Sequence, residues 1–295
     1  MWFKNLCVFQ LQDDWQLTAG ALEALLTKHP LLPCSGLNLH SQGFVAPREG
    51  GALVESADRH LLIALGLEDK LIPRSALDEQ VRQHAAEYER RHGLAPGRKL
   101  RRELREQALA ELAPRALARR RTVRAWIDPA ARRLVVDTAS PGAAEKLATA
   151  LREVLESLPL IRPQPATAVA VRLTSWLAAG RAPANFTLGD EVELRGGKPE
   201  TPRVRCANQP LTAPMVRRLL QDGLTVVKLS LHWRERAALT LDQTLQLRRL
   251  RPLETTPAAA DTTDPAQRFD ADLRLMIGDL GQLIKDLGTA LAVSL

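Results

Sequence analysis

The chain has 295 residues, of which 45% are hydrophobic and 25% are charged. This length and composition exclude a disordered or fibrous protein and predict a globular one with two or three domains. Forty-one Lys and Arg residues against 34 Asp and Glu residues leave a net charge of +7, which favours negatively charged partners.

The first part of the chain predicts strands and a helix. Between Phe3 and Leu11, polar and apolar residues alternate as in a strand of a half-buried sheet. A helix is predicted over Ala19 to Lys28. The apolar run from His60 to Leu67 is short and bounded by turn-forming residues, so it is predicted to be a second strand.

From Ser75 onward the pattern predicts a helical hairpin. Apolar residues recur every three to four positions until His92 and Gly93, where a helix can end on glycine. A second helix is predicted to begin near Pro96. It combines an apolar stripe from Leu100 to Leu112 with clustered arginines, and the short connection makes an antiparallel pair.

Beyond the hairpin, strand patterns return, followed by another helix. Strands are predicted over Val123 to Ile127 and Leu134 to Asp137, with a turn at Asp128 between them. A helix is predicted over Ala143 to Leu158. The proline-rich stretch from Pro159 to Pro165 is typical of a domain boundary.

The last part of the chain predicts a helix, a β-meander and a final helix. Thr212 is predicted to cap a helix over residues 213–222 that ends at Gly223. Three β-rich runs follow, at Leu224 to Trp233, Ala237 to Leu241 and Leu245 to Leu250. A linker at Thr255 to Thr263 precedes a long helix capped by Asp264 and Pro265.

The positive charge is concentrated in one segment. From Lys70 to Arg133 there are 17 Lys and Arg residues and 8 Asp and Glu residues, a net of +9, so the rest of the chain carries −2. This asymmetry is typical of a surface that contacts phosphates. A solvated helix face, or the arginine-rich composition of a GC-rich genome, would produce a similar count.

Motifs for catalysis and metal binding are weak. Neither a P-loop nor a G-x-G-x-x-G sequence occurs, and the six histidines and three cysteines lack metal-ligand spacing. We therefore expect no metal and no cofactor. The one acidic cluster, Asp270 and Asp272 with Asp261 and Asp264 upstream, is typical of helix capping more than of a magnesium site. Widely spaced cysteines and the lack of a signal peptide predict a cytoplasmic protein.

The basic residues of the hairpin segment are the strongest candidates for a binding site. The candidate phosphate contacts are Arg98, Lys99, Arg101, Arg102, Arg105, Arg115, Arg119 and Arg120. Phosphate contacts position a protein on a duplex without reading its sequence, and aromatic residues, at 4%, are too scarce to favour base stacking. Alternatively, these arginines are solvated or pair with Glu103, Glu106 and Glu111.

Five short motifs are spread over nearly the whole chain: Met1-Trp2-Phe3-Lys4-Asn5-Leu6, Leu112-Ala113-Pro114-Arg115-Ala116, Trp126-Ile127-Asp128, Ser157-Leu158-Pro159 and Ala266-Gln267-Arg268-Phe269-Asp270-Ala271-Asp272. Together, in this order and at this spacing, they resemble the RdgC family of bacterial recombination-associated proteins. The resemblance implies a ring-shaped homodimer that surrounds double-stranded DNA without sequence preference. It also implies no catalysis, restraint of RecA-promoted recombination, and association with the nucleoid.

The resemblance also shapes the expected architecture. We expect an α+β fold of mixed antiparallel sheets with packed helices and a projecting helical hairpin. The expected domains are a central one (1–74 plus 122–162), a helical tip (75–121) and a base (163–295). The family implies a dimer contact at the tip, where this chain has Leu117 in place of an aromatic residue. Phe269 is interpreted as a core anchor.

Two other functions stay open at the level of sequence. One is a metal-dependent nuclease that uses Asp270 and Asp272. The other is a basic module that binds RecA directly, without DNA.

Overall fold

The computed structural model describes residues 2–183, 185–197, 202–253 and 264–295, which form an α+β fold. Within these ranges there are two antiparallel sheets and seven α-helices, as expected for the fold class. One sheet has the strand order β2-β4-β5-β6-β1-β7, with β3 paired to β4. The other has the order β12-β11-β10-β8-β9.

The chain divides into two compact units. Unit 1 comprises Met1–Leu22, Val54–Leu62 and Arg124–Leu295, and unit 2 comprises Glu23–Leu53 and Ile63–Val123. The division into central, tip and base domains stays a prediction.

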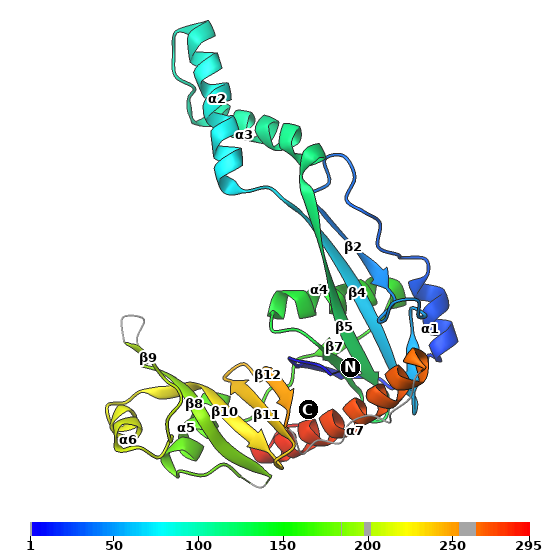
Figure 1. Cartoon of the computed structure of the whole chain (residues 1–295), viewed down its shortest axis with the longest axis vertical. Coiled ribbons are helices and arrows are strands. Elements are labelled where there is room, and N and C mark those ends of the chain that lie inside the picture. Colours follow the sequence, from blue (N-terminus) through cyan, green and yellow to red (C-terminus); the bar gives the residue numbers. More distant parts are fainter. Residues whose placement is uncertain (1, 184, 198–201, 254–263) are drawn as a thin grey trace. The chain divides into compact units, whose positions relative to one another are not determined.

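Unit 2 contains the helical hairpin and the strands that lead into and out of it. Helices α2 (Arg74–His92) and α3 (Arg98–Leu112) pack against each other, as the apolar spacing predicted (Figure 1). Helix α2 ends at Gly93, whose φ of 70° lies in the left-handed region that favours glycine. The other elements are α1 (Ala19–Leu26, beginning in unit 1), β2 (His40–Val45), most of β4 (His60–Leu71), the 3-10 turn Ala113–Arg115 and the first part of β5 (Leu117–Asp128).

The helical part of segment 75–121 ends at Arg115. Strand β5 begins at Leu117, so Leu117, Arg119 and Arg120 lie on a strand and not in the hairpin. The sequence showed β propensity only from Val123, because the first six residues of β5 are exposed and carry little apolar alternation.

In unit 1, strand β1 (Cys7–Leu11) pairs with β6 (Arg133–Val136) and β7 (Leu160–Ile161). The prediction that this first strand is half-buried is wrong. Val8 (6% exposed) lies in the core that also contains helix α7, and Phe9 (1% exposed) is buried too. The Arg162 guanidinium lies 5.3 Å from the centre of the Phe9 ring and pairs with Glu145. Both faces of β1 are therefore covered.

Helix α4 (Pro141–Leu155) starts two residues before its predicted first residue and ends three residues before its predicted last one. The Ser140 side chain caps it by accepting a hydrogen bond from the Ala143 amide (3.3 Å). Strand β3 (Glu55–Ala57) pairs with the start of β4.

The five-stranded sheet of unit 1 confirms the predicted meander of β10, β11 and β12. Its strands are β8 (Phe186–Arg195), β9 (Arg203–Cys206), β10 (Thr225–Trp233), β11 (Ala237–Asp242) and β12 (Leu247–Pro252). Its core residues pack with those of helices α5 (Val169–Ala178), α6 (Pro214–Gln221) and α7 (Pro265–Leu291) (Figure 1).

Of the two helix caps predicted in this region, one is confirmed and one is wrong. Asp264 caps α7 by accepting a hydrogen bond from the Ala266 amide (2.9 Å), as predicted. The Thr212 cap is wrong: Ala213 precedes the first turn of α6, and Pro214 occupies its start, where the missing N–H costs nothing. Phe269 is only partly buried against the core. The predicted linker Thr255 to Thr263 lies outside the described ranges.

Gly43 of β2 is required by a close approach of the backbone in unit 2. A Cβ at this position would lie within 3.0 Å of the Pro30 carbonyl oxygen and the Leu31 nitrogen. We expect Gly43→Ala to lower the free energy of unfolding by about 3 kcal/mol, because backbone atoms must move to admit the methyl group. Urea denaturation measures this, with Gly97→Ala as the control, since a Cβ there meets nothing within 4 Å. Equal midpoints for the two variants would contradict the assignment.

Candidate nucleic-acid interface

Helix α3 presents four arginines on one side. Arg101 and Arg102 follow Arg98 by three and four residues and precede Arg105 by four and three, and all four are exposed. This spacing places them on a single face of an α-helix. Ala108, two turns after Arg101, is fully buried.

Polar contacts between the helices fix the orientation of that face. Glu111 of α3 accepts a hydrogen bond from Gln80 (3.0 Å) and lies 3.1 Å from the His84 Nε2 of α2. The hydrogen bond from Gln107 is the largest of the contacts that lower the pKa of Glu111. Glu111 therefore stabilises the hairpin and does not neutralise the arginine face.

Some of the arginines make local contacts. Arg102 pairs with Glu106 (3.2 Å), and Arg105 pairs with Asp78 of α2 (3.0 Å). The Arg101 Nε donates to the Pro96 carbonyl (3.0 Å). Exposed ion pairs of this kind contribute only about 0–1 kcal/mol, so a phosphate group can displace them.

Four of the predicted contacts are free of such partners. Within the described part of the chain, no side-chain hydrogen bond or ion pair is made by Arg98, Lys99, Arg115 or Arg119, and all four are exposed. Of the glutamates proposed as alternative partners, only Glu106 pairs with one of the predicted contact residues there. Among the described residues, pairing with these glutamates therefore accounts for Arg102 alone.

Strand β5 holds Arg120 against a buried carboxylate. Its guanidinium donates to Glu68 of β4 at 3.0 and 3.1 Å, and Glu68 also accepts from the Cys34 amide (2.7 Å). The Cys34 amide and then Arg120 lower the pKa of Glu68. Arg120 thus both stabilises unit 2 and leaves about half of its side chain in solvent, at 54%.

The neighbouring Arg121 was missed as a candidate. It donates to Asp69 of β4 (2.5 Å), and Asp69 lies 2.8 Å from the Nδ1 of His40 on β2. The His40 contact is the largest of those that lower the pKa of Asp69. Successive residues of a strand point to opposite faces, so Arg120 and Arg121 place cations on both sides of the sheet. In the sequence, the acidic pair Glu68-Asp69 after the apolar run of β4 could have indicated partners for these two arginines.

Leu117 begins β5 and is 79% exposed. Such exposure of a large apolar side chain at a strand end leaves apolar area available for a partner.

Comparison with known proteins places the chain in a family. A family model described as "Putative exonuclease, RdgC" matches residues 1–294. The chain belongs to the RdgC family. A relative named "Recombination-associated protein RdgC" from Cupriavidus pinatubonensis is 38% identical over 293 residues, covering 99% of this chain and 98% of the relative. Relatives with the same name from Herminiimonas arsenicoxydans and Dechloromonas aromatica are 37% and 35% identical, each across 99% of this chain and 98% and 97% of the relative.

The exonuclease in the RdgC family description directs attention to the acidic residues of α7. Asp270 pairs with Arg274 one turn later (2.6 Å), and Asp264 caps the helix. Asp261 lies outside the described residues. In the described ranges, no group of three or more His, Cys, Asp or Glu side chains is arranged to hold a metal ion. None of the helices in the same ranges is long and apolar enough to cross a bilayer.

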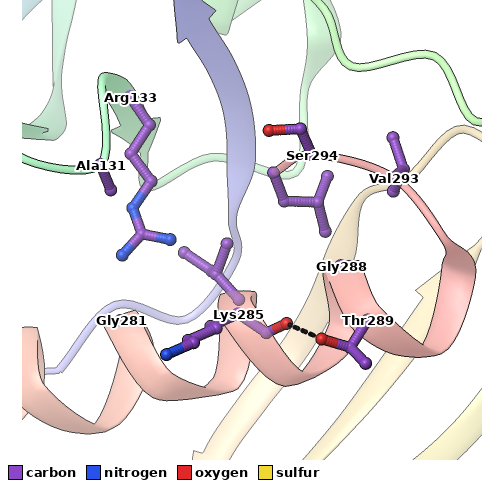
Figure 2. A pocket seen from close by; sticks show the side chains of 10 residues that line it. Ala131, Arg133, Gly281, Lys285, Gly288, Thr289, Val293 and Ser294 are labelled. Atoms are coloured by element: carbon purple, nitrogen blue, oxygen red, sulfur yellow. Dashed lines mark hydrogen bonds between the residues drawn. The ribbon is translucent and has the colours of Figure 1, made fainter.

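A hollow of about 370 Å³ lies beside α7 in this RdgC protein, and two basic side chains line it (Figure 2). Arg133 points into it from β6, and Lys285 lines it from α7. Arg133 already pairs with the buried Asp128 (2.8 Å) and lies over the Trp126 ring. Its charge therefore stabilises the fold of unit 1, and the hollow is a weaker candidate than the hairpin.

Proposed function

We propose that this protein binds double-stranded DNA without sequence preference and has no catalytic step. In this proposal a homodimer closes into a ring around the duplex and restrains RecA-promoted recombination by occupying it. The observation that carries the proposal is the exposed arginine face of α3 together with Arg115, Arg119 and Arg120. The recombination-associated names of the relatives support it.

The proposed contacts suit phosphates more than bases. Arginine side chains on one helix face and one strand can follow a phosphate backbone, and each neutralised phosphate releases counterions. The two aromatic residues of unit 2 are engaged elsewhere: Phe44 is buried, and Tyr88 stacks on His92 with ring centres 4.1 Å apart. Stacking on single strands would need exposed aromatic rings.

Leu117 is the proposed contact between protomers at the tip. Its exposure supports this role, and its side chain is smaller than the aromatic residue expected there, so less apolar area is buried in the contact. A two-fold symmetric dimer would bring the same patch of each protomer together.

The ring is tested by comparing linear and covalently closed duplexes of equal length, with the solution mass measured in parallel. A ring that closes around DNA slides off linear ends but stays on closed circles, so we expect slower dissociation from circles. The mass should be that of a dimer. A monomer at micromolar concentration, or equal dissociation from both substrates, would remove the ring from the proposal.

Arg119 and Arg120 separate the binding role from the structural role. We expect Arg119→Glu to weaken duplex binding about tenfold, the order of effect of losing a phosphate contact and adding a repulsive charge, at an unchanged melting temperature. Arg120→Glu should weaken binding and also lower the melting temperature, because it places a second carboxylate beside Glu68. Titration of a labelled duplex and thermal denaturation measure the two effects. Identical melting curves for both variants would contradict the role given to Glu68.

A second candidate is a magnesium-dependent nuclease, which the description of the family model favours. It requires DNA cleavage that depends on Mg²⁺ and is lost in Asp270→Asn. Direct action on RecA is a further outcome, recognised by inhibition of strand exchange that persists in variants that no longer bind DNA.

A further inference from the structure

The five-stranded sheet of unit 1 has one apolar and one charged face. Along β10, Leu229 and Leu231 lie in the core, whereas Lys228 and Ser230 lie on the opposite face. The charged face carries six basic side chains, which we call the cationic sheet face: Arg203, Arg205, Lys228, Arg248, Arg249 and Arg251. The neighbours Arg248 and Arg249 share this face because the pairing of β11 with β12 is irregular between them and Arg251, and each binds a carboxylate there.

Three carboxylates lie beneath these cations. Glu193 accepts from Arg203 and from Lys228 (2.9 Å), Glu191 pairs with Arg205 and Arg249, and Asp242 pairs with Arg248 (2.8 Å). The carboxylate side chains are only 6–18% exposed. Arg203, Arg205 and Arg249 are 58–65% exposed. A partner that approaches this face therefore meets guanidinium groups first.

Pairing with arginine favours the ionised form of Glu191. Arg249, whose two terminal nitrogens bind Glu191 at 2.8 and 3.0 Å, is the largest cause that lowers the pKa of Glu191. In the sheet order, β11 and β10 lie between β12 and β8, so the Arg249 and Glu191 side chains together bridge these two strands. The carboxylates hold the cations in place over the sheet, which reduces the entropy lost when a ligand binds.

Small residues leave a hollow between the basic strands. The hollow measures about 270 Å³, and its polar lining includes Ser230, Thr240, Arg249 and Arg251 together with the carboxylates of Asp190 and Glu191. Gly189 of β8 is needed there because a Cβ would overlap the Ser230 hydroxyl. Within the part of the chain that the structure describes, Arg251 has no side-chain hydrogen bond or ion pair, and it is exposed. Phosphate oxygens accept hydrogen bonds both from guanidinium groups and from the hydroxyl groups of Ser and Thr.

Six basic side chains against four carboxylates, the three paired ones and the exposed Asp190 at the hollow, still leave an excess of positive charge on a face without aromatic residues. We propose that the cationic sheet face is a second contact for the phosphodiester backbone of duplex DNA, separate from the hairpin. This inference rests on the proposed function. Counting charge along the chain missed the surface because its cations come from three strands and are interrupted by acidic residues elsewhere in unit 1.

The test neutralises two of these cations in the full-length protein. Arg203→Gln with Arg251→Gln leaves Glu193 paired to Lys228, so the sheet keeps its buried ion pair. We expect the affinity for a 30-base-pair duplex to fall about tenfold and the slope of log affinity against log salt to fall by about two. The matched control is Arg217→Gln with Arg218→Gln on α6, both exposed.

The outcomes separate this inference from the proposed function. If the hairpin variant described below loses binding while the sheet variant matches its control, the cationic sheet face is wrong and the proposed function stands. If the wild-type protein does not bind the duplex, both are wrong. Should the sheet variant melt at a lower temperature, Arg251→Gln alone decides the matter, because among the described residues that substitution removes no side-chain partner. An affinity equal to wild type then overturns the inference.

Discussion

The triple variant Arg101→Glu, Arg102→Glu, Arg105→Glu is expected to lose at least about 100-fold in duplex affinity at physiological salt. Each substitution removes a cation from the arginine face of α3 and adds a charge that repels phosphate. The loss should be the same for every duplex sequence, because phosphate contacts carry no sequence information. The salt slope should become shallower by about three. Titrations at several salt concentrations with two unrelated sequences measure both quantities.

The control for this variant is a second triple reversal, Arg181→Glu, Arg217→Glu, Arg218→Glu, at exposed positions of unit 1. It changes the net charge equally and should reduce affinity only slightly. Because Arg105 pairs with Asp78, the hairpin variant must be shown to melt like wild type. If it does not, Arg98→Glu with Lys99→Glu, which breaks no contact within the described residues, replaces it. Wild-type affinity in that variant would disprove the arginine face.

Asp286 of α7 is a position where we expect a large loss of stability. Its Oδ2 accepts from the Trp233 indole (2.8 Å), the Arg234 Nε (2.9 Å) and the Asn185 amide (2.9 Å), and its Oδ1 accepts from Gln282 (2.8 Å). The carboxylate is 10% exposed. It therefore ties the turn between β10 and β11 to the last helix.

Asp286→Ala should lower the free energy of unfolding by about 3 kcal/mol, because it leaves several donors without an acceptor, one of them a buried indole N–H. Denaturation monitored by tryptophan fluorescence measures the loss. Glu156→Ala, at the exposed end of α4, is the control and should change stability by no more than about 0.5 kcal/mol. A difference between the two variants of less than about 1 kcal/mol would rule out the role of Asp286.

The stability that Asp286 provides should also depend on pH. Burial alone would raise the pKa of Asp286, but the hydrogen bonds, led by that from Trp233, outweigh it and hold the pKa below its usual value. Since the folded-state pKa is the lower one, the contribution is complete above the unfolded value of about 3.9 and is lost as pH falls through the folded value. The stability gap between wild type and Asp286→Asn should thus stay constant from neutral pH to about pH 5 and narrow below about pH 4.

Local patterns predicted most elements of this fold. Apolar spacing placed α2, α3 and α7, and Gly93 and Asp264 marked helix ends, because capping depends on a few neighbouring residues. The errors arose where the local pattern of residues is weak or where contacts with distant parts of the chain determine the structure. The exposed start of β5 has little apolar pattern, and Ala213 precedes the first turn of α6 where Thr212 was expected. Likewise, alternation along β1 could not reveal that both of its faces are covered.

The candidate site divides in the same way. The amino-acid sequence by itself determined that positive charge gathers between Lys70 and Arg133 and that four arginines share a face of α3, because charge and helical spacing are local properties. Only the tertiary structure decided which cations are engaged. Arg120 meets Glu68 across 52 positions of sequence, and Arg249 meets Glu191 across 58. Such pairs form between strands far apart in the chain, so no local pattern encodes them, and the cationic sheet face exists only once the sheet has folded.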